Sequence, residues 1–167
     1  MKSLNIKFYT LYLLLAFLFT TGMQCKKTGD TVKEDVLPAE TQTGKGTFGC
    51  LVDGEVWLPT GKSFIPALST TIQFDILTIA TNKSNENLVM GVRNISNIGD
   101  YDLKATDNIA EFSIGTVSYK CFEGKLTITK YDKINQIISG KFWFKAKNSN
   151  GENIEITEGR FDDKYTN

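Results

Sequence analysis

The residue types that most often carry catalysis are sparse in this chain. Its 167 residues include no histidine, three cysteines and two tryptophans. Without histidine there is no Ser-His-Asp triad, no Cys-His pair and no histidine-ligated zinc. A cysteine nucleophile needs a basic or cationic neighbour, and Lys120 is the one candidate beside Cys121. We therefore predict no catalytic residue, no metal site and no cofactor.

The carboxylates are numerous but scattered along the sequence. The pairs Asp100/Asp102 and Asp162/Asp163 could flank a cation, and residues 148–152 weakly resemble a calcium loop. That segment lacks an acid at the first ligand position, so its Asn-Gly pair predicts a hairpin turn instead. A carbohydrate hydrolase would need two facing carboxylates. This is the enzymatic alternative.

Cysteines are the second group that could do chemistry. Cys50 and Cys121 are an even pair if Cys25 is modified, and in an oxidising compartment they could form a disulfide. The alternative is two reduced thiols that pack as small apolar residues. The spacing in the sequence leaves both open.

Trp143 is the strongest candidate for a contact residue. The alternation around it puts Phe142 and Phe144 on one face and Trp143 on the other, with Lys141 and Lys145. A large aromatic side chain on a charged face can stack on a sugar or anchor a protein partner. We predict a ligand or partner face there, while the alternative is a tryptophan covered by lysine stems.

The first 24 residues have the composition of a leader. Lys2 and Lys7 precede the apolar run of residues 8–19, and small residues follow. This order is typical of a secretory signal peptide. Residues 21–27 resemble the lipobox of bacterial lipoproteins, in which the cysteine, here Cys25, receives a diacylglyceryl group and becomes the first residue. We predict lipid attachment at Cys25, which fastens the chain to a membrane.

Residues 25–46 have the composition of a flexible tether, because they hold few apolar residues and many charges. From residue 47 to 167, turn residues recur between alternating apolar and polar segments, which predicts β-strands. Asp53-Gly54 predicts a two-residue hairpin that pairs Cys50 with Trp57. The pattern further predicts one strand over residues 70–80 and a bulge at Gly115.

The expected fold is all-β, with about eight or nine antiparallel strands. A β-sandwich is favoured, and a closed or partly open barrel is the alternative, since both arrangements cover the core and the strand edges. Residues 41–59, 124–132 and 138–162 resemble a Bacteroidota family of lipoproteins classed as a domain of unknown function. The resemblance implies an exported, lipid-anchored single domain and implies no activity.

The charge balance narrows the classes of partner. Lys+Arg and Asp+Glu are both 19, so there is no basic surplus of the kind that binds nucleic acid. We expect a protein anchored by its lipid in the bacterial cell envelope, in the outer membrane, that acts as a non-enzymatic binding or structural module. Its partner would be a glycan or a protein of the envelope.

Overall fold

The computed structural model describes residues 35–104 and 106–167. Cys25, the leader and the first part of the expected tether therefore lie outside the described residues. Within the described residues the chain forms ten β-strands: β1 (Thr47–Val52), β2 (Glu55–Trp57), β3 (Leu68–Gln73), β4 (Ile76–Lys83), β5 (Glu86–Val92), β6 (Gly99–Asp102), β7 (Ile109–Ile114), β8 (Val117–Asp132), β9 (Ile137–Lys147) and β10 (Asn153–Lys164).

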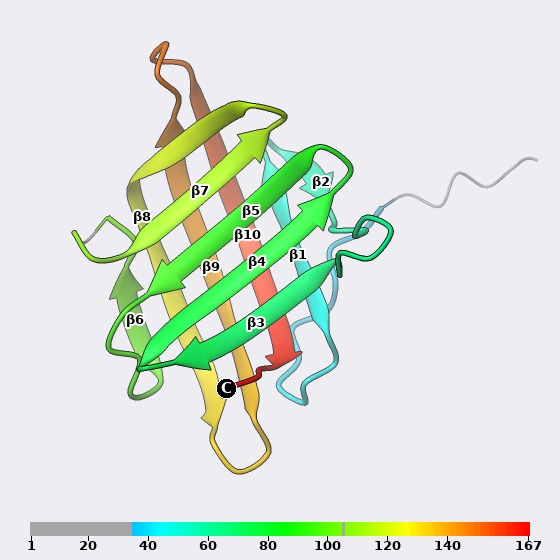
Figure 1. The fold of residues 1–167 in the computed structure, drawn as a ribbon, viewed down its shortest axis with the longest axis vertical. Helices are drawn as coiled ribbons and strands as arrows, with labels where there is room; N and C mark the ends of the chain where they lie inside the picture. Colours follow the sequence, from blue (N-terminus) through cyan, green and yellow to red (C-terminus); the bar gives the residue numbers. More distant parts are fainter. Residues whose placement is uncertain (1–34, 105) are drawn as a thin grey trace, which may run out of the picture. The chain divides into compact units, whose positions relative to one another are not determined.

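All strand pairs are antiparallel and belong to one sheet. The strand order is β2-β1-β10-β9-β8-β7-β5-β4-β3, and β6 pairs with β8 beside this path. In Figure 1, β3, β4, β5 and β7 form the near layer, while β9, β10 and β1 cross behind it. The long strand β8 pairs with β7 near its start and with β6 and β9 further along, and so carries the sheet from one layer to the other.

The tail after β10 brings the two layers together at one end. Thr166 donates its backbone N–H to Thr70 O at 3.0 Å and accepts from Ile72 N at 2.8 Å, both in β3. Thr166 thus lies beside β3, the strand at one end of the sheet order. The expected all-β antiparallel fold is confirmed, as a single sheet curled into a partly open barrel, with ten strands in place of eight or nine.

One apolar cluster fills the space between the layers. Phe48 lies 5.1 Å from Phe142 and 6.2 Å from Trp57, and Trp57 lies 5.7 Å from Phe112, measured between ring centroids. All four are buried. The rings come from strands of both layers, since Phe112 belongs to β7 and Phe142 to β9. Burial of each such side chain stabilises the fold by about 1.5–3 kcal/mol. The aromatic group therefore holds the two layers together.

The Asp53-Gly54 hairpin is confirmed with its predicted register. Val52 pairs with Glu55, Leu51 with Val56 and Cys50 with Trp57. Asp53 and Gly54 have φ angles of 49° and 87°. Both central residues of a type I′ turn need positive φ, and an Asp-Gly pair adopts it readily.

The single strand expected over residues 70–80 is wrong. The chain turns at Phe74 and Asp75, so β3 and β4 form a hairpin, and Phe74 is exposed where an inward side chain was expected. Both turn residues have positive φ, 51° and 59°, without a glycine or an asparagine that would have revealed the turn. Gly115 likewise lies in the turn between β7 and β8 and not in a bulge.

Candidate functional site

Trp143 lies on the outer face of β9, as the alternation predicts. Its neighbours Phe142 and Phe144 are buried in the core, whereas Trp143 is half-buried. Lys125 of β8 is its register partner on one side. On the other side, the pairing of β9 with β10 is interrupted between Ile156 and Gly159.

This interruption is a β-bulge beside Trp143. Thr157 and Glu158 occupy the place where one residue would pair, and Glu158 has a φ of 52°. Gly159 follows against the ring of Phe142, where an added Cβ would lie 2.5 Å from Cε2. A bulge bends its strand and redirects side chains. Here it opens the outer surface next to the indole.

A groove runs along this outer face. One hollow of about 420 Å³ is lined by Trp143, Thr127, the bulge and their neighbours, and a second of about 220 Å³ is lined by residues 39–42, Thr129, Phe161 and others. The two adjoin, because Glu40, Lys141 and Arg160 line both. We call them together the Trp143 groove.

The charges in the Trp143 groove are paired. Lys141 Nζ lies 2.7 Å from Glu40, and Arg160 lies 3.0 Å from Glu158. The hydrogen bond from Lys141 is the main cause that lowers the pKa of Glu40 below its ordinary value. The groove therefore presents an aromatic ring among neutralised cations and anions, and not the lysine-rich patch that the sequence alone suggests.

Lys145, the third residue of the predicted face, lies apart from this arrangement. It contacts Glu123 of β8 at 3.6 Å and does not line either hollow. Lys141, Trp143 and Lys145 thus alternate onto the same outer face of β9, and Trp143 and Lys141 line the groove while Lys145 does not.

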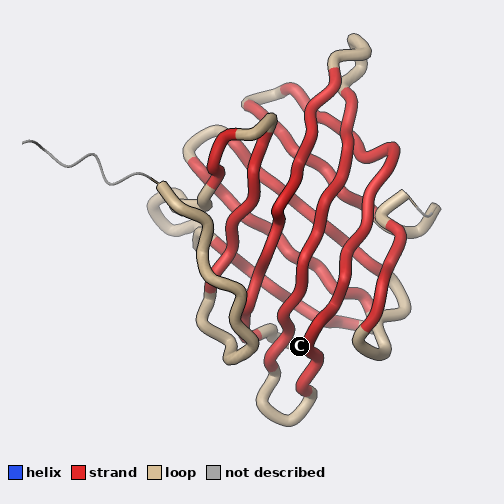
Figure 2. The backbone as a smooth tube through the Cα atoms, turned by 180° about the vertical axis from the view of Figure 1, so that it is seen from behind, coloured by secondary structure: helices blue, strands red, loops and turns tan. Residues whose placement is uncertain are grey.

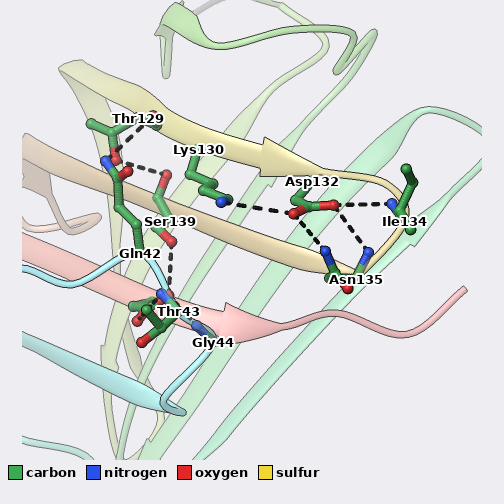
Figure 3. Close-up of polar contacts among 10 residues, drawn as sticks. Gln42, Thr43, Gly44, Thr129, Lys130, Asp132, Ile134, Asn135 and Ser139 are labelled. Carbon is green, nitrogen blue, oxygen red and sulfur yellow. Dashed lines mark hydrogen bonds and ion pairs between the residues drawn. The ribbon is translucent and has the colours of Figure 1, made fainter.

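Residues 37–46 form a strap over the outer face of the sheet (Figure 2). Leu37 and Pro38 lie against Gly49 of β1, and Gln42 Nε2 donates to Thr129 O of β8 at 3.4 Å (Figure 3). The strap supplies Glu40 to the groove. These residues belong to the range expected as a tether, and here they lie in the same compact unit as the strands, which begins at Asp35.

Asp162 of β10 holds the strap. Its carboxylate is buried and accepts hydrogen bonds from three backbone N–H groups and two hydroxyl groups. The donors are Thr41 Oγ1 at 2.6 Å, Thr43 N at 3.0 Å, Gly44 N at 2.7 Å, Lys45 N at 3.3 Å and Ser139 Oγ at 2.8 Å. Burial alone would raise the pKa of Asp162, but these hydrogen bonds outweigh it and lower the pKa to about 2.

The sequence reasoning missed this contact. It considered Asp162 with Asp163 as a cation site, but the two side chains of neighbouring strand residues point to opposite faces. The pKa of Asp163 is raised, mainly by burial, whereas the hydrogen bonds to Asp162 make the net shift of its pKa downward. A usable signal was present, because a Thr-x-Thr-Gly segment offers hydroxyl and backbone donors in the pattern that surrounds an anion.

Cys50 and Cys121 are both free thiols, so the disulfide considered from the sequence is not formed. They belong to β1 and β8, which are separated in the sheet by β10 and β9. Three strand spacings correspond to roughly 14 Å along the sheet, while a disulfide needs Cα atoms within about 7 Å. Burial raises the pKa of Cys50 to about 12, and the pKa of Cys121 is also raised, first by burial.

The other carboxylates considered as cation ligands have protein partners. Asp100 accepts from Lys125 at 2.9 Å and from Thr127 at 2.6 Å. Asn148 Oδ1 accepts from the backbone N–H groups of Asn150 and Glu152, which closes a hairpin turn. Among the described residues, no group of three or more acidic or cysteine side chains is placed to hold a metal ion.

Over residues 35–104 and 106–167, the structure contains no helix with the length and hydropathy needed to cross a membrane.

Comparison with known proteins identifies the family. A family model described as a domain of unknown function (DUF6252) matches residues 45–163, from the end of the strap almost to the end of β10. No curated protein and no solved structure matches the chain. Since the match spans more than half of the sequence, the chain belongs to this domain family of unknown function.

Proposed function

We propose that the protein is a non-enzymatic module of the bacterial cell envelope, anchored by lipid at Cys25, that binds a glycan in the Trp143 groove. The leader of residues 1–24 and the lipobox-like residues 21–27 support the anchor. The anchor supplies the location, and the barrel is the rigid support for the groove.

The placement of Trp143 is the observation that carries the binding proposal. An indole face stacks well on the apolar C–H face of a sugar ring. Around it the groove offers Thr127, Lys141 and Arg160 as donors, and Glu40 and Glu158 as acceptors. Such a mixture of neutralised charges suits a ligand with many hydroxyl groups better than it suits a strongly charged ligand.

Hydrolysis by paired carboxylates has weaker support. A glycosidase needs one carboxylic acid with a raised pKa to protonate the leaving oxygen. Glu40 and Glu158 in the groove are each paired with a cation, and the pKa of Glu40 is lowered. These carboxylates favour binding over acid catalysis.

Binding can be tested on an array of bacterial envelope glycans, with hits measured by calorimetry. We expect Trp143→Ala to lose most of the affinity, because one stacked ring contributes about 1 kcal/mol or more. Lys145→Ala is the matched control on the same strand and should bind like the native protein. If Trp143→Ala keeps its affinity while its unfolding midpoint is unchanged, the groove is not the binding site.

The anchor is tested separately in the native host. Mass spectrometry of the purified protein should find a diacylated Cys25 as the first residue, and density fractionation should place the protein in the outer membrane. The variant Cys25→Ser should be released from membranes. A chain that retains residues 1–24 with an unmodified Cys25 would contradict the anchor and leave the binding proposal standing.

A further inference from the structure

The loop between β2 and β3, residues 59–67, presents two apolar side chains to solvent. Phe64 is 101% exposed and Ile65 is 51% exposed. The loop tip is a small hairpin in which Lys62 N donates to Ile65 O at 2.9 Å and Ile65 N donates back to Lys62 O. Ser63 has a φ of 40°, which turns the chain there. Phe64 therefore stands at the outermost point of a defined turn.

Asn82 of β4 fixes the base of this loop. Its backbone O accepts from Thr60 N at 3.0 Å and from Gly61 N at 2.8 Å, and its backbone N donates to Ala67 O at 3.0 Å. The side chain Nδ2 donates to Pro66 O at 3.2 Å. Four hydrogen bonds to one residue hold both ends of the loop, so the exposure of Phe64 is imposed by the fold. Exposed apolar groups that a fold holds in place often mark contact surfaces.

The strap enters the folded unit at the same edge. An added Cβ on Gly49 would touch Pro38, Leu37 and Leu58, and Leu58 directly precedes the loop. In Figures 1 and 2 the loop and the start of the described chain project at the same side of the barrel. Val36, which precedes these contacts, is 72% exposed. The described chain thus begins beside the loop.

The linker to Cys25 is short. Nine residues lie between Cys25 and Asp35, and a random coil of that length would span roughly 17 Å on average. A lipid at Cys25 would therefore keep this edge of the barrel near the bilayer. Because the anchor would hold the loop close to the bilayer, the effective concentration of the loop at the lipid surface would be high. A weak apolar contact is then enough to dock it.

We propose that the loop of residues 59–67 docks on the lipid surface that carries Cys25, with Phe64 and Ile65 at the boundary between headgroups and acyl chains. The proposal rests on the proposed lipid anchor. The chemistry fits this position, because aromatic side chains favour the membrane interface and Lys62 can contact lipid phosphates. In the sequence, Lys26, Lys27 and Lys33 lie between Cys25 and the described residues, and they would supply further basic groups close to the anchor.

The opposite end of the barrel also exposes apolar side chains, and it provides the control. Phe74 is 96% exposed in the turn at the other end of β3. Six residues of β3 place this turn about 20 Å from the loop. If the loop faces the membrane, the Phe74 turn faces away from it.

The test uses the full lipidated protein, purified from membranes and reconstituted in vesicles of phosphatidylethanolamine and phosphatidylglycerol. In a Cys121→Ser background, an environment-sensitive fluorophore is attached through Ser63→Cys or, as the control, through Asp75→Cys. We expect a blue shift and quenching by spin-labelled lipid at position 63, and neither at position 75. Adding Phe64→Ser and Ile65→Ser should abolish the quenching at position 63.

The outcomes separate this inference from the anchor. Protein that floats with the vesicles but shows no quenching at position 63 overturns the docking and leaves the anchor intact. Quenching at position 75 instead also overturns it. A blue shift at position 63 that grows with protein density and is insensitive to spin-labelled lipid indicates contact between copies and overturns it too. Protein that carries no lipid and fails to float contradicts the anchor itself.

Discussion

At the scale of single residues, Asp162 decides how the chain before β1 is arranged. Its buried carboxylate accepts five hydrogen bonds, and four of the donors come from the strap. A buried carboxylate is stable only when such donors replace water. The strap in turn supplies Glu40 to the Trp143 groove, so a residue that does not line the groove determines part of its wall.

We expect Asp162→Asn to lower the free energy of unfolding by about 2 kcal/mol, since hydrogen bonds to a charged acceptor are lost and an amide N–H₂ faces backbone donors. Chemical denaturation at neutral pH measures this change. Asp107→Asn, at an exposed position in the loop before β7, is the control and should unfold like the native protein. An equal midpoint for Asp162→Asn would show that the strap is held by other contacts.

The same carboxylate predicts a pH dependence. Its pKa of about 2 in the folded state is below the value of about 3.9 in unfolded chains. A lowered pKa stabilises the folded protein above the unfolded value, and this stabilisation is lost as the pH falls toward 2. Between about pH 5 and pH 2, the native protein should therefore lose about 2 kcal/mol more than Asp162→Asn. Parallel pH profiles for the two proteins would exclude this assignment.

The thiols give a second prediction at the residue scale. Cys50 is fully buried and burial raises its pKa to about 12, so almost no reactive thiolate exists at pH 8. In the folded protein iodoacetamide should leave Cys50 unmodified and react slowly with the half-buried Cys121. After unfolding, both should react. Peptide mass mapping distinguishes the sites, and fast modification of native Cys50 would show that β1 opens readily.

At the scale of the elements, turns differ in how well their residues suit them. The Asp53-Gly54 turn has the residues that positive φ requires, whereas the β3–β4 turn places Phe74 and Asp75 at φ angles of 51° and 59°. A side chain other than glycine, asparagine or aspartate in this region costs roughly 1–2 kcal/mol, so the cost falls mainly on Phe74. The β3–β4 hairpin is therefore held by its strands and by Asp75 O, which accepts from Ile95 N at 2.9 Å.

We expect Phe74→Asn to raise the free energy of unfolding by about 1 kcal/mol, because asparagine adopts positive φ at lower cost. The control is Ile134→Asn in the β8–β9 turn. Ile134 is also almost fully exposed, but its φ is not positive, so its replacement should have little effect. Thermal unfolding of both variants measures the difference. A destabilised Phe74→Asn would mean that the phenyl ring makes contacts that its exposure does not reveal.

The sequence predicts those parts of the structure that depend only on residues close together in the chain. Alternation fixes which face of β9 holds Trp143, and turn chemistry fixes the Asp53-Gly54 register. The Trp143 groove also needs Glu40 from the strap and the bulge at Glu158, and these meet only through pairing between distant segments. The strap itself has the composition of an unfolded chain. The strap is held in place by the carboxylate of Asp162, which lies more than 100 residues further along the chain, so the residues of the strap do not reveal it.

At the scale of the whole molecule, Thr166 bridges β3 and the segment that follows β10 in the partly open barrel. Thr166 exchanges hydrogen bonds with Thr70 and Ile72, so the tail after β10 lies on β3, the strand at one end of the strand order. Tyr165 beside it is buried and lies 5.9 Å from Tyr131. Closure protects part of β3, which would otherwise be a free edge.

Replacing Thr166 by proline tests the closure, because proline removes the N–H that Thr70 O accepts. We expect Thr166→Pro to lose about 1 kcal/mol of stability and to speed amide hydrogen exchange at Ile72. Thr166→Ala keeps the backbone N–H and should exchange like the native protein. Unchanged exchange at Ile72 in Thr166→Pro would show that β3 is protected without the tail.

The strand order also has a consequence for how the chain is completed. The β1–β2 hairpin forms from neighbouring residues, yet β10 is the one strand that joins it to the remainder of the sheet. The β1–β2 hairpin must therefore wait until β10, about 100 residues further along the chain, has been synthesised before it is incorporated. Contacts of such long sequence separation form slowly. A chain that lacks β10 would leave this hairpin without a neighbour and the buried ring of Phe48 in water, so the hairpin joins the fold only when β10 is present.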